Sequence, residues 1–211
     1  PEGAPAVASL PSEHNGYVTY GCFNNLAKVN DAVIETWSRI LHADPAARLL
    51  LKAKQLGSDE LRASLLARFA GYSIGPERLE LEGAGSYAEY LDTYARIDIA
   101  LDPFPYTGGT TTAESLWMGV PVVTLKGDRF IAHQGESLLH AAGLSEMIAA
   151  DKEAYVQLAL NFAADRPALA AMRAGLRARV AASALFDAPR YARALETAWH
   201  GMWAEWCARQ R

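Results

Sequence analysis

The chain has 211 residues, 51% of them hydrophobic, which is enough for one α/β domain of ordinary size and too little for two full substrate-binding domains. Its 20 basic and 24 acidic residues give a formal net charge of -4, which argues against nucleic acid as a partner. Cys22 and Cys207 belong to no CxxC or Cys/His cluster and are expected to be buried or half-buried free thiols. The sequence has no apolar run of about 18 residues and no signal-peptide pattern in residues 1–10, so we expect a soluble, cytoplasmic protein without a membrane partner.

From Gly16 onward, short aliphatic runs alternate with longer segments of helical period, which is the pattern of repeated β-α units around a parallel sheet. Residues 1–16 are rich in Pro and Ala and begin without Met, and we expect them to be a linker in a piece of a longer protein. Strands are predicted at residues 18–23, 48–52, 79–82, 97–101 and 122–125. Residues 17–211 are therefore expected to form one α/β domain, a Rossmann-like parallel sheet flanked by helices, with a helical C-terminal portion.

Helices are expected between these strands and after the last of them. Ser58 is placed to cap one helix, and Ser86 followed by Glu89 forms a capping box that opens another. The predicted helices cover residues 33–41, 59–70, 86–96, 110–119, 134–142, 152–164, 167–182 and 189–209. No strand is expected beyond Gly127, so the last four helices should cover the sheet. Core packing is expected for the tryptophans at helical-face positions, Trp37, Trp117, Trp199 and Trp203.

The stretch LDPFPYTGGTTTAESLWMGVPVVTL, residues 101–125, combines a strand end, a glycine pair, a helix and a further strand. Gly108 and Gly109 let the backbone approach a ligand closely, and the free N–H groups at the helix start present partial positive charge to a phosphate. Thr110, Thr111 and Thr112 add hydroxyl donors at the same place. Because an open α/β sheet binds ligands beyond the carboxyl ends of its strands, this loop predicts a diphosphate site. The alternative is a turn followed by an ordinary helix cap.

Two further features of this region suit the nucleoside part of a ligand. Glu114 lies about one turn into the helix, where its carboxylate can accept hydrogen bonds from the vicinal hydroxyls of a ribose. An exposed surface glutamate is the alternative. Tyr87 and Tyr90, on the helix after the third strand, approach the same edge of the sheet, where an aromatic ring can flank a nucleobase; a buried packing role fits these residues equally well.

The segment YGCFNNLAK, residues 20–28, carries amides and a lysine at the end of the first strand. It contains no GxGxxG pattern, which argues against a dinucleotide-binding dehydrogenase. Lys28 can meet a diphosphate as a point charge, and Asn25 can hydrogen-bond a sugar or phosphate, although a solvated surface lysine is the commoner arrangement. His133, in the later segment HQGES, is a candidate for a contact with the diphosphate, against a surface or helix-capping role.

Three segments, FNNLAK, LDPFPYTGGTTTAESLWMGVPVVT and HQGESLL, together resemble the C-terminal lobe of the O-GlcNAc transferase family (glycosyltransferase family 41), and within it the SPINDLY branch. The resemblance covers residues 17–209. It implies a GT-B arrangement, in which this donor-binding lobe pairs with an N-terminal lobe that follows tetratricopeptide repeats. It also implies transfer of GlcNAc or fucose from a nucleotide sugar to Ser or Thr of proteins, with inversion and without a metal or another cofactor.

The resemblance carries donor-binding roles onto residues of this chain. It assigns Lys28, Thr110 and Thr111 to the donor diphosphate. Asn25 is assigned to the phosphate or the sugar, and Glu114 falls at the acidic position that holds ribose hydroxyls. These side chains are expected to converge beyond the carboxyl ends of the strands.

His133 falls where similar sequences place a basic residue near the donor, and two other positions depart from the family pattern. Gly109 and Tyr90 both stand where relatives have a histidine, the second of them beside the base. These departures leave the donor open between UDP-GlcNAc and GDP-fucose. The catalytic base and the binding of acceptor proteins are expected on the N-terminal lobe and the repeats, so no catalytic residue is predicted in this chain.

Two other functions stay open from the residues alone. One is a different GT-B transferase, or an epimerase, acting on a nucleotide sugar, which shares the pattern of residues 114–121. The other is a non-catalytic module whose helical second half binds a partner protein. No DxD metal motif is present, because Asp98 and Asp102 stand on either side of a predicted strand.

Overall fold

The computed structural model describes residues 3–210, and within them one six-stranded sheet has the order β3-β2-β1-β4-β5-β6. Every neighbouring pair of strands is parallel. The strands are β1 (Thr19–Cys22), β2 (Arg48–Lys52), β3 (Leu79–Glu82), β4 (Ile99–Leu101), β5 (Val122–Leu125) and β6 (Ile148–Ala149). The α/β prediction is therefore confirmed. The prediction that strands end before Gly127 is wrong, because β6 adds two residues to the edge of the sheet beside β5.

The helices are α1 (Ser12–Asn15), α2 (Asp31–Ala43), α3 (Asp59–Ala70), α4 (Tyr87–Thr93), α5 (Thr110–Trp117), α6 (Gln134–Ala141), α7 (Lys152–Ala164), α8 (Arg166–Ala181) and α9 (Ala188–Arg209). Side-chain caps fix where several of them begin. Ser58 accepts a hydrogen bond from the Leu61 N–H at the start of α3, and Ser86 and Glu89 form the predicted capping box of α4. These local signals explain why α3 and α4 begin at the predicted residues.

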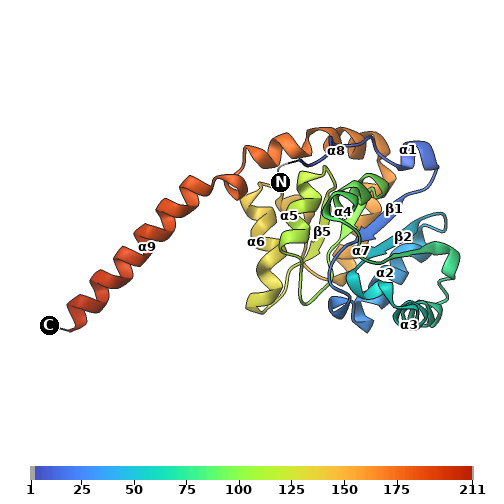
Figure 1. Ribbon diagram of the computed structural model, residues 1–211, viewed down its shortest axis with the longest axis horizontal. Coiled ribbons are helices and arrows are strands. Elements are labelled where there is room, and N and C mark those ends of the chain that lie inside the picture. The colour runs from blue at the N-terminus through green and yellow to red at the C-terminus, as the bar shows by residue number, and fades with distance from the viewer. Residues whose placement is uncertain (1–2, 211) are drawn as a thin grey trace.

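Helices cover both faces of the sheet, and alternate side chains of each strand pack against one layer or the other. In β2, Leu49 and Leu51 belong to the core shared with α2, α3 and α7, whereas Leu50 belongs to the core shared with α4, α5, α6 and α8. Trp37 of α2 is 0% exposed in the first of these cores, as predicted. Figure 1 shows the resulting three-layer arrangement.

The N-terminal segment packs on the domain, whereas the C-terminal helix does not. Residues 3–16, expected to form a linker, lie against the domain: Leu10 is buried, and the Ser12 N–H donates to buried Asp98 at 2.9 Å. At the other end, α9 projects away from the body (Figure 1), and none of residues 188–209 that form it is buried.

The prediction of core packing is therefore wrong for Trp199 and Trp203 of α9, which are 58% and 63% exposed. Their spacing marks an apolar face without identifying what that face packs against. Within residues 3–210, no helix combines the length and the apolar composition needed to cross a bilayer.

The strand order places a topological switch point between β1 and β4. From β1 the chain proceeds to β2 on one side and returns to β4 on the other. In open parallel sheets the crevice outside the carboxyl ends at such a point is the usual ligand site. The segments that follow these two strands, residues 23–28 and 102–109, lie there and carry the predicted donor-binding motifs.

Candidate functional site

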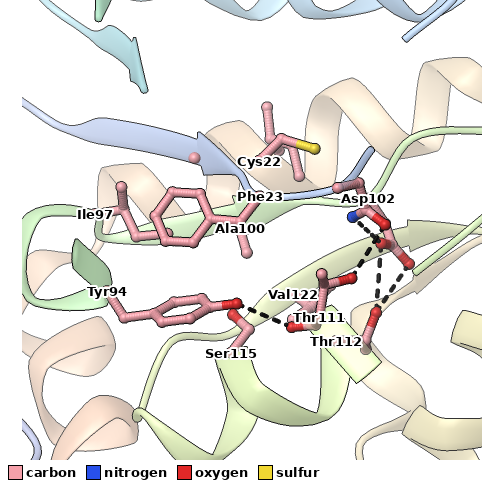
Figure 2. Close-up of a pocket in the computed structure, with 13 residues that line it drawn as sticks. Cys22, Phe23, Tyr94, Ile97, Ala100, Asp102, Thr111, Thr112, Ser115 and Val122 are labelled. Atoms are coloured by element: carbon pink, nitrogen blue, oxygen red, sulfur yellow. Dashed lines mark hydrogen bonds between the residues drawn. The ribbon is translucent and has the colours of Figure 1, made fainter. Parts of the chain in front are cut away.

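A buried carboxylate occupies the switch point. Asp102 follows β4, is 2% exposed, and accepts hydrogen bonds from the Gly108 N–H and Thr124 Oγ1, both at 2.9 Å. A longer contact of 3.4 Å comes from Nδ2 of Asn24, which follows β1. Figure 2 shows Asp102 facing Thr112 in the first turn of α5. Burial raises the pKa of Asp102 from 3.8 to about 6, and the bonds from Thr124 and Gly108 and the nearby Lys28 charge counteract part of that rise.

Asn24 connects this carboxylate to two of the predicted phosphate ligands. Its Oδ1 accepts from Lys28 Nζ at 3.1 Å and from Thr111 Oγ1 at 3.0 Å. The side chain that follows β1 thus joins the 3₁₀ turn Leu26–Lys28 to the start of α5. Lys28 and the start of α5, which the sequence predicts to converge, both donate a hydrogen bond to the Asn24 side-chain amide.

Lys28 is half-buried and held in a defined position. Its Nζ also donates to the Thr107 carbonyl at 2.9 Å and lies 3.9 Å from the centre of the Tyr106 ring. An ammonium has three N–H donors, and the bonds to Thr107 and Asn24 use two of them. Burial lowers the pKa of Lys28, while the Asp102 charge raises it. The bonds to Thr107 and Asn24 leave one N–H donor of Lys28 without a hydrogen-bond partner among the described residues.

The glycine pair before α5 contains two different kinds of position. A Cβ on Gly108 would lie 2.5 Å from Asp102 Oδ1 and 2.4 Å from Thr112 Oγ1, so this residue must be glycine for the loop to close on Asp102. A Cβ on Gly109 would meet only Gln134 Oε1, at 3.6 Å. Gly109 and Thr110, at the start of α5, also line an open hollow, and a phosphate-binding helix start requires such access.

Glu114 of α5 is bonded to tyrosines of α4. Oε1 accepts from Tyr87 OH at 2.9 Å and Oε2 accepts from Tyr90 OH at 2.8 Å. Tyr90 also shares a 2.9 Å hydrogen bond with buried Tyr94, whose ring packs on Phe23. Burial raises the pKa of Tyr90, so its hydroxyl stays protonated as a donor. The predicted ribose carboxylate and the predicted base-flanking residue are thus direct neighbours.

Two open hollows flank these residues. One, of about 310 Å³, is lined by Tyr87 and Tyr90 together with the ends of β1, β2 and β3. The other, of about 590 Å³, is lined by Gly109, Thr110 and His133. His133 lies at the end of a 3₁₀ turn, and its Nδ1 is 2.6 Å from Glu136 Oε2. The predicted site residues Tyr87 and Tyr90 therefore line one hollow, and Gly109, Thr110 and His133 line the other.

Asn25 has a structural role in this state. Its Oδ1 accepts from the Ala27 N–H at 2.9 Å, which caps the turn that carries Lys28, and from Gln55 Nε2 at 2.7 Å.

In the described part of the chain, residues 3–210, no cluster of three or more His, Cys, Asp and Glu side chains is arranged to hold a metal ion.

Sequence reasoning missed the two residues at the centre of the site, Asn24 and Asp102. The sequence analysis names Asp102 only in finding that no DxD metal motif is present, and it assigns a donor contact to Asn25 rather than to Asn24. A signal was present, since each is a polar residue directly after a buried strand, and β1 and β4 are neighbours. Only knowledge of the strand order would have shown that they meet.

A family model, curated relatives and solved structures all match this chain to one group of glycosyltransferases. The family model described as glycosyl transferase family 41 matches residues 7–195. A probable UDP-N-acetylglucosamine-peptide N-acetylglucosaminyltransferase, SPINDLY of Petunia hybrida, is 39% identical over 208 residues, 98% of this chain and 22% of that relative. A solved structure of a Thermobaculum terrenum O-GlcNAc transferase mutant has a TM-score of 0.91 at 36% identity, over 100% of this chain and 40% of that one.

A more distant neighbour shares the fold. Anabaena HepE, in complex with UDP and glucose, has a TM-score of 0.59 at 15% identity, over 88% of this chain and 51% of that one. The chain spans about a fifth of the length of the curated relatives it matches, since the SPINDLY match covers 22% of that protein. Its parallel sheet flanked by helices is that of a GT-B glycosyltransferase. Because the family model matches most of the sequence, the chain belongs to glycosyltransferase family 41.

Proposed function

We propose that this chain binds the nucleotide-sugar donor of a protein O-glycosyltransferase, with the donor diphosphate between Lys28 and the start of α5. The observation that carries the proposal is the shared hydrogen bonding of Lys28 Nζ and Thr111 Oγ1 to Asn24, at the start of α5, where Gly109 and Thr110 line an open hollow. A charged donor and a helix N-terminus on one side of a crevice form a strong anion site.

The nucleoside fits the neighbouring residues. The ribose hydroxyls are placed on Glu114, which already accepts two hydroxyl donors from Tyr87 and Tyr90. The base is placed in the hollow of about 310 Å³ beside these rings. The sugar then extends toward Thr110 and His133, which line the larger groove.

The names of similar proteins support this class of donor. SPINDLY of Petunia hybrida is named for transfer from UDP-N-acetylglucosamine to peptides, and HepE was solved with UDP and glucose. Gly109 and Tyr90 depart from the histidines of the family, so the proposal admits uracil or guanine as the base, and titration with UDP and GDP distinguishes the two. The cytoplasmic location and the tetratricopeptide repeats stay predictions of the sequence.

In the proposed reaction this lobe stabilises the leaving group. As the bond between the sugar and the diphosphate breaks, negative charge grows on the departing phosphate, and Lys28 and the N–H groups of α5 are placed to neutralise it. The resemblance implies that these groups take the place of a metal ion. The general base and the acceptor protein are proposed to come from parts of the protein outside this chain.

The proposal is tested by calorimetric titration of the chain with UDP and GDP. Micromolar affinity for one of them is expected, with loss of that affinity in Lys28→Met. If neither nucleotide binds to the folded chain, the proposed function is wrong and a role as an interaction module becomes the better explanation.

A further inference from the structure

We infer that Asp102 is a positioning residue of this site: it fixes the orientation of the Asn24 amide, and Asn24 in turn holds Lys28 and Thr111 against the ligand. The inference rests on the proposed function, because the ligand in question is the donor diphosphate. Asp102 is buried at the end of β4 and lies behind Asn24, so it acts through Asn24 rather than by touching the donor.

The chemistry of the three groups determines how Asn24 is turned. An ionised carboxylate only accepts hydrogen bonds, so the Asn24 NH₂ group must face Asp102, as the 3.4 Å contact with Nδ2 shows. The amide oxygen then faces Lys28 Nζ and Thr111 Oγ1, at 3.1 and 3.0 Å. Rotating the amide by half a turn would set its oxygen against a carboxylate and its NH₂ against an ammonium. Both contacts would be repulsive, so the observed orientation is strongly selected.

Asp102 is itself held by hydrogen bonds from residues other than Asn24. The Gly108 N–H and Thr124 Oγ1, each at 2.9 Å, fix its carboxylate, and Thr112 of α5 lies beside it (Figure 2). The carboxylate thus joins β1, β4, β5 and the start of α5 at one point. A fixed acceptor at this point holds the phosphate-binding groups in position before a ligand arrives.

Positioning and simple electrostatics predict opposite results for the same substitution. Asp102→Asn removes a negative charge close to an anion site, and by Coulomb's law alone this should strengthen anion binding. If Asp102 works by orienting Asn24, the substitution should weaken binding, because an Asn at 102 accepts the Asn24 NH₂ group less strongly and can present its own NH₂ instead. The sign of the change in affinity therefore distinguishes a positioning role of Asp102 from a purely electrostatic effect.

The experiment measures binding of inorganic pyrophosphate and UDP to the chain by calorimetry. Asp102→Asn is expected to lower both affinities by about tenfold, the loss of one well-placed charged hydrogen bond. Asp98→Asn is the matched control: Asp98 stands at the other end of β4, is equally buried, and accepts from the Ser12 and Thr19 N–H groups, away from the site. Asp98→Asn should leave both affinities unchanged. Unchanged or higher affinity in Asp102→Asn would overturn the inference.

A double-substitution measurement tests the same inference if Asp102→Asn fails to fold. In Asn24→Ala, Lys28 loses one of its two hydrogen-bond acceptors and keeps the Thr107 carbonyl, so Lys28→Met should reduce pyrophosphate affinity less in that background than in the wild type. An equal reduction in both backgrounds would refute a positioning role for Asn24. Wild-type chain that binds neither pyrophosphate nor a nucleotide would instead overturn the proposed function, and the inference with it.

Discussion

Replacing Lys28 by Met tests the diphosphate site most sharply, because it removes the charge and keeps most of the apolar stem. Two of the three ammonium N–H groups are used by Thr107 and Asn24, so one charged donor is available to the donor phosphate. A hydrogen bond to a charged group contributes about 1.5–3 kcal/mol, which corresponds to roughly a ten- to a hundredfold loss of affinity for UDP or GDP.

The same substitution also affects the fold. Lys28 is half-buried, and its removal leaves the carbonyl of buried Thr107 without that donor. We therefore expect the free energy of unfolding to fall by about 1–3 kcal/mol. Affinity is measured by calorimetry on protein shown to be folded by circular dichroism, and stability by urea unfolding.

Arg48→Met is the control for the loss of one positive charge. Arg48 begins β2 at the amino end of the strands and packs on the Tyr17 ring, away from the carboxyl ends where the site lies. This variant should keep the wild-type affinity for nucleotides. Equal affinity in Lys28→Met and the wild type would refute the assignment of Lys28 to the diphosphate.

Three further results are expected. Glu114→Ala should weaken UDP or GDP binding about tenfold and leave pyrophosphate binding unchanged, because Glu114 is assigned only to the ribose; equal losses for both ligands in calorimetry would contradict this. The Asp102 pKa is raised in the folded protein, from 3.8 to about 6, so the folded state binds a proton that the unfolded chain lacks between those values. As the pH rises from about 4 to about 7, the free energy of unfolding should therefore fall on the order of 2–3 kcal/mol more in the wild type than in Asp102→Asn. If urea unfolding shows the same pH dependence of stability in both proteins, the raised Asp102 pKa is wrong. Trp37→Ala should destabilise the protein by about 3–5 kcal/mol, since the indole is 0% exposed and donates to Tyr155, whereas Trp203→Ala on α9 should change stability by within about 0.5 kcal/mol; similar unfolding midpoints for the two would be inconsistent with the structure.

Local signals allowed much of the fold to be predicted. β2, β3 and β5 have the predicted bounds, and the predicted capping box at Ser86 and Glu89 is present. Strand bounds of this kind and a capping box can be predicted because they depend on residues that are neighbours in the sequence. The strand β6 was missed because two residues are too few to show an alternating pattern. The surroundings of Trp199 and Trp203 depend on what lies beside α9, which periodicity does not reveal.

The site could be predicted only in part for a related reason. Lys28 and Glu114 carry charge next to recognisable segments, so the sequence is enough to single out both as candidates. The contact between Asn24 and Asp102 joins residues 78 positions apart and exists only because β1 pairs with β4. Spacing along the chain contains no information on that pairing, so the sequence gives no reason to connect Asp102 with Asn24.

The central claim, that this chain carries a nucleotide-sugar site, is tested most directly by thermal unfolding in the presence of UDP, GDP, UDP-GlcNAc and GDP-fucose. A ligand that binds only the folded state stabilises it by RT ln(1 + L/Kd), where L is the free ligand concentration, and so raises the unfolding midpoint. We expect a rise with one base and its nucleotide sugar, smaller or absent in Lys28→Met. An unchanged midpoint with all four ligands at about 1 mM, where even weak binding of about −4 kcal/mol is detectable, would contradict the claim.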